Sequence, residues 1–310
     1  MKIRPLFLIL VIFLVITGCS PDMTLLERIK SDGKLVVVTR NSATTYYQGP
    51  FGYTGLEYDL ASLFAEQLGV KLEIVVEDNF GKMFDMLDSG KADLAASNLS
   101  ITDARKQRLA FGPSYMEVVS QVAYRLRNNK KRPRRITDLI DKDIEVAANS
   151  SHVEILTKLK EKHPDLSWHE NENMDTDELL QLVWSQFIDY TIADSMEIKL
   201  KQRFYPEIAV AFNIGESRPV AWALKQDIDT SLYNETISFF SEIKKKGVLK
   251  QLINKYYGHV RKFSYVGTQS YLRDINQKLP EFINAFKLSA YTNNLDWRLL
   301  AAVGYQESHW

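Results

Sequence analysis

The last residues of the chain carry a carboxylate that could act as an acid. Glu307 lies eight residues after Leu299 and four after Val303, so all three would share one face of a helix. Asp296 stands at the expected N-cap of that helix. A carboxylic acid at the end of an apolar face is partly removed from water, which favours the protonated form that general-acid catalysis needs near neutral pH. On spacing alone, however, a solvated glutamate at a helix end is the stronger interpretation.

A second group of side chains has the chemistry of a zwitterion site. A carboxylate held in a partly dry cleft needs a planar cation and hydroxyl donors, which Arg105 and Ser100 could supply. Ser150 and Ser151 precede an expected helix, whose N-terminal N–H groups would add to an anion site. An ammonium group needs a fixed anion, and Asp194 follows directly after an expected strand. Taken singly, each of these residues is more often a surface or capping residue.

The composition excludes several classes of function. The 310 residues include 39 Lys and Arg and 39 Asp and Glu, so the formal charge is zero and a nucleic-acid partner is not expected. The single Cys excludes an internal disulfide framework and a Cys-based zinc site. The five His residues are scattered without an H-E-x-x-H motif, so we expect no metal and no other cofactor. The length is about twice the ~150 residues of a usual domain.

The N-terminus has the pattern of an export signal. Lys2 and Arg4 precede an uncharged apolar run at 6–16, which is shorter than the ~20 residues that span a membrane. We therefore expect residues 1–18 to be a signal peptide. The run ends in Ile-Thr-Gly-Cys, which resembles the lipobox of bacterial lipoproteins and implies a lipidated N-terminus at Cys19. The Ser after this Cys favours an anchor in the outer membrane, facing the periplasm. The alternative is a plain signal peptide.

Strand and helix patterns alternate through the body of the chain. Apolar runs at 35–38, 72–76 and 93–96 suit buried strands of a parallel sheet, and helical spacing recurs between them. A second α/β unit follows, with strands at 144–148 and 190–193. Further strands are expected at 118–126, 208–212 and 220–224, and helices at 60–68, 80–87, 153–160, 179–184 and 233–256. The patterns predict an α/β fold.

A basic run lies between these two units. Seven Lys or Arg residues occur in the eleven positions 125–135. We interpret the run as a solvated loop at a domain entrance. The alternative is a contact with anionic lipid or cell-wall polymer.

Three motifs resemble the family 3 periplasmic solute-binding proteins. They are Gly-Leu-Glu-Tyr-Asp-Leu-Ala at 55–61, Gly-Lys-Ala-Asp followed by Ser-Ile-Thr-Asp-Ala-Arg within 90–105, and Phe-Gly-Pro-Ser-Tyr at 111–115. The resemblance covers residues 33–258 and implies a two-lobed periplasmic-binding-protein fold of type II. Lobe 1 would comprise about 33–120 and 205–258, and lobe 2 about 121–204. Residues 19–32 would be the lipidated N-terminus and a linker.

The resemblance also assigns roles to side chains. It places the α-carboxylate of an amino acid on Arg105 and Ser100, and the α-ammonium group on Asp194. The further ligand-contacting residues under the resemblance are Asn98 at the amino end, Ser151 at a helix N-terminus and Tyr46 over the ligand. The family often has Gly-Thr-Thr where this chain has Ser-Ser-His at 150–152. The ligand is therefore expected to be either a small amino acid or a peptide fragment of the cell wall.

The C-terminal residues resemble a second family. After a linker at 259–268, residues 269–310 have helical spacing, and DWRLLAAVGYQESHW at 296–310 resembles the start of the catalytic domain of family 1 lytic transglycosylases. Glu307 matches the catalytic Glu of their E-S-x-aromatic signature. The resemblance implies an all-α, lysozyme-like domain that cleaves the MurNAc–GlcNAc β-1,4 bond of peptidoglycan and forms 1,6-anhydroMurNAc. The family's G-x-x-Q and A-Y-N segments do not follow, so this truncated chain is expected to bind solute without cutting glycan.

Two functions therefore remain open. The first is a peptidoglycan lytic transglycosylase with a regulatory domain that binds an amino acid or a muropeptide. The second is the amino-acid-binding lipoprotein of an ABC importer. The helical pattern at 269–310 favours the first.

Overall fold

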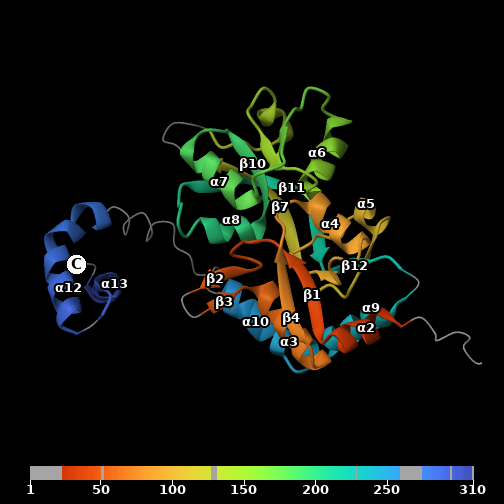
Figure 1. The fold of residues 1–310 in the computed structure, drawn as a ribbon. Coiled ribbons are helices and arrows are strands. Elements are labelled where there is room, and N and C mark those ends of the chain that lie inside the picture. Colours follow the sequence, from red (N-terminus) through yellow and green to blue (C-terminus); the bar gives the residue numbers. More distant parts are fainter. Residues whose placement is uncertain are drawn as a thin grey trace, which may run out of the picture.

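The computed structural model describes residues 23–49, 52–126, 131–227, 229–258, 274–293 and 295–308. The expected signal peptide, Cys19 and the linker at 259–268 lie outside the described residues. Residues 23–258 form two lobes, which two long strands connect (Figure 1). Within the described ranges, we find no helix whose length and apolar character would suit a membrane span.

Lobe 1 is built on a five-stranded sheet in the order β4-β1-β5-β12-β6. The predicted parallel strands are present, because β1 (Lys34–Thr39) is parallel to β4 (Lys71–Val76) and to β5 (Leu94–Ala95). β12 (Ala223–Lys225) is antiparallel to β5 and to β6 (Leu109–Phe111). The remaining elements of lobe 1 are α2 (Leu25–Asp32), β2 (Tyr47–Gly49), β3 (Gly52–Thr54), α3 (Leu56–Leu68), α4 (Phe80–Asp88), α5 (Asp103–Lys106), α9 (Ser231–Lys245) and α10 (Val248–Tyr257).

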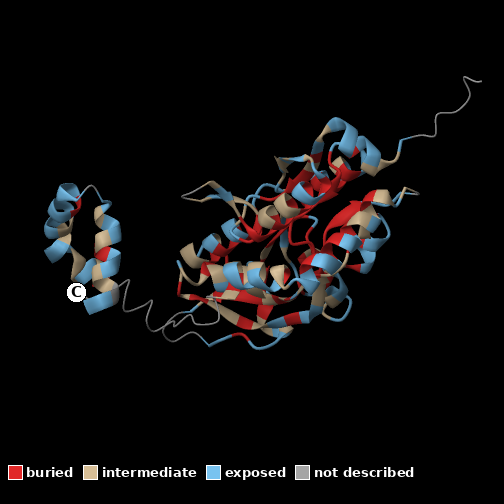
Figure 2. Ribbon diagram, turned by 90° about the horizontal axis from the view of Figure 1, so that it is seen from below, coloured by how far each residue is buried: buried red, intermediate tan, exposed pale blue. Residues whose placement is uncertain are grey.

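Two separate cores lie in lobe 1. Phe64, Trp222 and Phe239 form the aromatic centre of the larger core, in which α3 and α9 pack with ring centroids 5.1–5.8 Å apart. A second core includes Met83 of α4 and Val38 of β1. In Figure 2 the buried residues run as a red band through this lobe, between helices with exposed outer faces. The cores hold the sheet rigid, so that the ends of its strands can position a site.

The predicted single helix over 233–256 is wrong. Gly247 has φ of 75° and separates α9 from α10. Glycine adopts this left-handed conformation at little cost, so the chain turns there although the apolar spacing continues on both sides.

Lobe 2 has a three-stranded sheet in the order β10-β7-β11. β10 (Tyr190–Asp194) and β11 (Ile208–Val220) are both antiparallel to β7 (Met116–Arg125), which lies between them. A small parallel pair, β8 (Glu145–Ala147) and β9 (His169–Asn171), lies beside this sheet. The other elements of lobe 2 are the 3₁₀ helix η1 (Ile136–Leu139), α6 (Ser151–Lys160), α7 (Thr176–Ser185) and α8 (Ser195–Lys201).

β7 and β11 run through both lobes and connect them (Figure 1). The strands predicted at 208–212 and 220–224 are in fact one long strand, β11, followed by the short β12. The pairing of β11 with β7 shifts register between Val210 and Asn213 and again before Ser217. Such irregularities bend a strand, which suits a connection between two lobes.

The C-terminal residues form a helical hairpin of α12 (Leu279–Thr292) and α13 (Trp297–Ser308). Pro280 stands in the first turn of α12, where proline is tolerated. Asp296 caps α13 as predicted, since its Oδ1 accepts a hydrogen bond from the Arg298 backbone N–H at 2.9 Å. Leu299 and Val303 are 55% and 53% exposed.

Candidate functional site

One pocket between the lobes brings together five of the six predicted ligand-contacting residues. Its lining includes Asn98, Ser100 and Arg105 from lobe 1, and Ser151 and Asp194 from lobe 2. The sequence separates these residues by up to 96 positions, and the two-lobed fold places them around one space. The pocket is also lined by Arg40, Phe80, Ser150, His152, Thr176 and Glu197.

Arg105 is fixed at the boundary between the lobes. It lies in the short helix α5, which begins at Thr102, whose hydroxyl accepts a hydrogen bond from the Arg105 backbone N–H. The guanidinium Nη1 donates to the Ser100 carbonyl at 3.1 Å, and Nη2 donates to the Asn149 carbonyl in lobe 2 at 3.4 Å. Burial lowers the pKa of Arg105 to about 10, against the opposing effect of Glu154. The guanidinium therefore stays charged at neutral pH and can bind an anion.

Asn98 is held in an unusual backbone conformation. Its φ is 53°, in the left-handed region that asparagine tolerates better than most residues. The buried Glu57 carboxylate accepts a hydrogen bond from the Asn98 backbone N–H at 2.7 Å and another from Trp222 Nε1 at 2.8 Å. Tyr115 donates a third, short hydrogen bond to Glu57. The Asn98 amide is thus presented to the pocket by groups anchored in the core of lobe 1.

The anionic side of the pocket comes from the start of α8. Asp194 ends β10 and accepts a hydrogen bond from Ser120 Oγ at 3.2 Å. Glu197, one turn later, accepts a hydrogen bond from the Asp194 backbone N–H and lies 3.4 Å from the Arg40 guanidinium. Burial raises the pKa of both carboxyl groups, and Arg40 opposes the shift in each.

His152 is buried beside these carboxylates. Burial lowers its pKa to about 4, although Glu197 favours the charged form, so the imidazole is neutral at pH 7. One ligand atom each from His152, Asp194 and Glu197 lie within 4.8 Å of one another, a set that could in principle hold a metal ion. Arg40 already compensates Glu197, so a dication would meet a neighbouring cation. The scattered His residues of the sequence predicted no metal, and their spacing gave no indication of this proximity.

Unpartnered polar atoms concentrate in this pocket. Among the described residues, the buried side-chain polar atoms that lack a hydrogen-bond partner are five in number. They are Asn98 Oδ1, Asn98 Nδ2, Arg105 Nε, Ser150 Oγ and His152 Nδ1. All five belong to residues that line the pocket. Buried polar atoms are almost always paired, so their concentration at one place indicates a ligand-binding site.

Comparison with known proteins assigns the region that forms the two lobes to a family. Residues 35–259 match the bacterial extracellular solute-binding proteins, family 3. The chain belongs to this family. The match covers both lobes and both connecting strands, so the predicted motifs at 55–61, 90–105 and 111–115 lie within it.

Solved structures support the fold of the family 3 region. A mutant of ArgBP from T. maritima superposes with a TM-score of 0.67 and 23% identity over 75% of this chain and 99% of that one. The amino acid ABC transporter substrate-binding protein AbpA from Streptococcus pneumoniae, bound to L-arginine, gives a TM-score of 0.65 and 25% identity over 76% and 98%. The predicted two-lobed α/β fold of type II is thereby confirmed.

Curated relatives extend beyond the family 3 region. The membrane-bound lytic murein transglycosylase F 1 of Alkalilimnicola ehrlichii is 42% identical over 93% of this chain and 58% of its own length. The membrane-bound lytic murein transglycosylase F of Pseudomonas fluorescens is 43% identical over 96% of this chain and 61% of its own length. The chain thus spans about three-fifths of these relatives.

Tyr46 does not line the pocket of the family 3 region, contrary to the prediction that its ring covers the ligand. It stacks on Tyr53 with ring centroids 4.9 Å apart and packs against Tyr58 at 5.6 Å. Burial and the hydrogen bond to Tyr53 raise the pKa of Tyr46 to about 12. Its aromatic neighbours keep the ring in this cluster, and the ring that lines the pocket is Phe80.

Glu307 lies on α13, outside the family 3 region. Its side chain is exposed, and so are Leu299 and Val303 on the same helix. The predicted partial removal of this carboxyl from water is therefore wrong for the described residues. The hydroxyl of the neighbouring Ser308 donates to the Gly304 carbonyl at 2.8 Å.

Sequence reasoning missed five residues that line the pocket, namely Arg40, Phe80, His152, Thr176 and Glu197. Arg40 directly follows β1, where strand ends of parallel sheets commonly carry ligand contacts. Glu197 stands three residues after Asp194, a capping-box spacing that could have identified it. Phe80 has the appearance of a core residue, and no pattern in the sequence distinguishes it from one.

Proposed function

We propose that the pocket between the lobes binds a small zwitterion, either an amino acid or a muropeptide fragment. The observation that carries this proposal is the concentration of five unpartnered buried polar atoms on its lining. Those atoms include both donors and an acceptor, and charged groups of both signs stand beside them. A ligand with a carboxylate and an ammonium group would pair with them.

Each end of the ligand has suitable partners. Arg105, Ser100 and the N-terminus of α6 at Ser151 would hold the carboxylate, since a planar guanidinium and free N–H groups favour an anion. Asp194 would hold the ammonium group, and the Asn98 amide would accept or donate beside it. The solved relative AbpA is bound to L-arginine, but the presence of Arg40 in this pocket argues against a cationic side chain here.

The pocket must open to admit such a ligand. The cavity has a volume of about 20 Å³, which is room for about one water molecule. Direct contacts close it, among them the hydrogen bond from Thr102 Oγ1 in lobe 1 to Glu154 in lobe 2 at 3.0 Å. Rotation of the lobes about β7 and β11 would break these contacts and expose the lining.

We further propose that the chain belongs to a lytic transglycosylase whose family 3 domain regulates its activity. The names of the curated relatives and the match of Glu307 to the E-S-x-aromatic signature support this. The substrate would be peptidoglycan glycan strands. A lipid at Cys19 would anchor the protein to the outer membrane on its periplasmic side.

Glu307 would supply the chemistry in the whole protein. As an acid it would protonate the glycosidic oxygen between MurNAc and GlcNAc, and as a base it would then take the proton of the C6 hydroxyl that closes the 1,6-anhydro ring. No external water needs activation, so one carboxylate suffices, unlike the two of the glycoside hydrolases. Because Glu307 is exposed on α13, we propose that residues 20–310 alone bind solute but do not cut glycan.

The alternative, a binding lipoprotein of an ABC importer, has less support. The relatives that match 93–96% of this chain are named as murein transglycosylases. The helical hairpin of α12 and α13 also lies outside residues 35–259, which match the family 3 solute-binding proteins.

Two measurements test the two proposals separately. Calorimetric titration of residues 20–310 with L- and D-amino acids and with murein stem peptides should reveal one-to-one binding. Release of 1,6-anhydromuropeptides from murein sacculi should occur with the product of the complete gene and be lost in its Glu307→Gln variant, while residues 20–310 release none. If the complete product bound solute without cleaving murein, the importer alternative would be favoured. If the Glu307→Gln variant cleaved murein as well as the parent does, Glu307 would be excluded as the catalytic acid.

A further inference from the structure

Lobe 2 exposes two phenylalanine rings to solvent. Phe187 is 76% exposed and Phe204 is 71% exposed, more than any other large apolar side chain described within residues 23–258. Single exposed apolar residues are common on protein surfaces. Two such rings at one place, however, indicate a surface that is covered in use.

Both phenylalanines are close in sequence to members of one aromatic pair. Trp184 near the end of α7 and Tyr205 after α8 have ring centroids 4.5 Å apart. Phe187 follows Trp184 by three residues, and Phe204 directly precedes Tyr205. We call these four residues the aromatic patch. It lies where α7 and α8 end, away from the pocket between the lobes.

The exposure of Phe187 departs from the usual end of a helix. The N–H of Gln186, with φ of 68°, bonds to the Val183 carbonyl, and the N–H of Phe187 bonds to the Leu182 carbonyl. In this type of helix end, the residue at the position of Phe187 commonly packs back on the helix. Here the ring remains in solvent, so local packing does not explain why a phenylalanine stands at this position.

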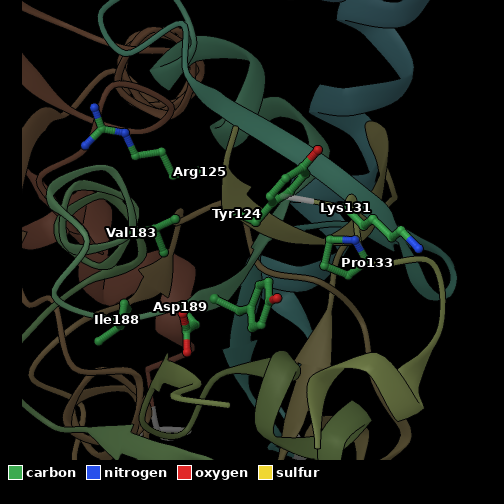
Figure 3. A pocket seen from close by; sticks show the side chains of 8 residues that line it. Tyr124, Arg125, Lys131, Pro133, Val183, Ile188 and Asp189 are labelled. Atoms are coloured by element: carbon green, nitrogen blue, oxygen red, sulfur yellow. The ribbon is translucent and has the colours of Figure 1, made fainter. Parts of the chain in front are cut away.

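Cations border the aromatic patch. Arg125 lies over the Trp184 ring at 5.4 Å and lines a pocket together with Lys131, Val183 and Ile188. Figure 3 shows this pocket, with Arg125, Val183 and Ile188 on one side of it and Lys131 on the other. The pocket therefore lies between α7, which contributes Trp184 to the aromatic patch, and the chain at Lys131 and Pro133.

That chain is strongly basic. Lys131, Arg132, Arg134 and Arg135 are all exposed, and we call them the basic segment. Among the described residues, Asp138 is the acidic side chain that pairs with this segment, through Arg135 at 3.3 Å. Near the aromatic patch, Glu207 accepts a hydrogen bond from Trp184 and Asp177 pairs with Lys201, while Asp189 lines the pocket beside Lys131. The basic segment thus retains an excess of positive charge.

We propose that the aromatic patch and the basic segment together dock lobe 2 on an anionic phospholipid surface. Phenylalanine rings enter the boundary between headgroups and acyl chains, and neighbouring Lys and Arg side chains bind the anionic headgroups. A single lipid anchor holds a protein only reversibly, whereas an anchor together with a basic patch holds it firmly. The predicted lipid at Cys19 would then have a second contact, independent of the ligand and of the glycan substrate.

Vesicle sedimentation tests this docking. Residues 20–310 include every residue that the structure describes and lack the acylated Cys, so their binding reports the protein surface alone. We expect binding to vesicles that contain about one-third phosphatidylglycerol, and weaker binding in high salt or to phosphatidylcholine vesicles. The Phe187→Ser, Phe204→Ser double variant should bind at least about tenfold more weakly. Lys131→Gln and Arg134→Gln should each cost about fivefold and reduce the salt dependence.

Matched variants elsewhere on the protein distinguish binding through this surface from non-specific adsorption to vesicles. Leu288→Ser with Tyr291→Ser removes exposed apolar side chains from α12, and Lys244→Gln with Lys245→Gln removes exposed cations from α9. Both pairs should bind vesicles as the parent does. Circular dichroism checks that every variant is folded. Equal vesicle binding by parent and lobe 2 variants would overturn the proposal, as would binding to purified murein sacculi but not to vesicles.

Discussion

The Arg105 guanidinium donates a hydrogen bond across the lobes to the Asn149 carbonyl at 3.4 Å. The same group donates to the Ser100 carbonyl within lobe 1. The remaining nitrogen, Nε, has no hydrogen-bond partner within the described part of the chain and lies 4.0 Å from Glu154, beyond hydrogen-bond distance. The Arg105 side chain therefore hydrogen-bonds to both lobes in this closed form, and its Nε–H is available to a ligand.

Replacing Arg105 with Lys should abolish this arrangement. Lysine keeps the charge but has no planar fork, so it cannot hold two carbonyls and a carboxylate together. We expect ligand affinity in calorimetry to fall at least about 30-fold. Arg108→Lys is the matched control, because Arg108 is exposed and pairs with Asp85 and Asp88 on the surface. Equal losses in the two variants would contradict the role given to Arg105.

Phe80, and not Tyr46, should contribute to binding. The Phe80 ring lies 4.7 Å from the Arg40 guanidinium and 5.2 Å from that of Arg105, so it supports both cations. Phe80→Leu should weaken ligand binding about tenfold, through lost cation–π contact and looser positioning. Tyr46→Leu should leave the dissociation constant within about twofold of the parent, since its ring lies outside the pocket. A larger loss of ligand affinity in Tyr46→Leu would support the prediction that the Tyr46 ring covers the ligand.

His152 should make the stability of the fold depend on pH. Its pKa is lowered by burial from 6.5 to about 4, so the unfolded chain takes up a proton before the folded one does. The resulting stabilisation is complete above about pH 6.5 and is lost as the pH falls towards 4. Lowering the pH from 7 to 5 should therefore reduce the free energy of unfolding by about 2 kcal/mol through this group alone.

Urea unfolding of parent and His152→Gln at both pH values measures this effect. Asp194 and Glu197 have raised pKa values and change stability in the opposite direction, but both are present in parent and variant. The difference between the two proteins therefore reports His152 together with its effect on the pKa of Glu197, which the charged imidazole lowers. His169→Gln, which replaces an exposed imidazole on β9, should behave as the parent. A variant with the same pH dependence as the parent would refute the buried neutral imidazole.

Gly55 should tolerate no side chain. It precedes α3 with φ of 140°, and a Cβ there would lie 2.0 Å from the Thr45 carbonyl oxygen. Gly55→Ala should therefore lower the free energy of unfolding by at least about 2 kcal/mol. Gly90 also has a positive φ, of 69°, but a Cβ there meets no atom within 4 Å. Gly90→Ala should cost only about 1 kcal/mol, so urea midpoints that are equally lowered would contradict the steric argument.

The parallel strands and most of the ligand-contacting residues were predictable from the sequence. Runs such as Leu35 to Val38 are apolar on both faces, which is a local property that a buried strand requires. Arg105 and Asp194 were identified because their neighbours match family motifs, and the structure brings both to one pocket. Local pattern and motif therefore predict a strand or a site residue correctly where the structure depends on that segment of the chain alone.

The misses come from contacts between distant segments. Tyr46 is removed from the pocket by Tyr53 and Tyr58, whose position depends on the fold of the β2–β3 hairpin. His152 reaches two carboxylates only because α6 and α8 start at the same pocket. The apolar face before Glu307 predicted burial, but spacing along one helix cannot say whether another segment covers that face.

Calorimetric titration of residues 20–310 and of their Asp194→Asn variant tests the central claim most directly. Asparagine keeps the size and the hydrogen bond to Ser120 but removes the charge that would hold an ammonium group. The account predicts that at least one zwitterionic amino acid or stem peptide binds the parent with one-to-one stoichiometry, and that the variant binds it at least about 30-fold more weakly. Absence of binding across all zwitterions tested, or equal affinity of parent and variant, would contradict it.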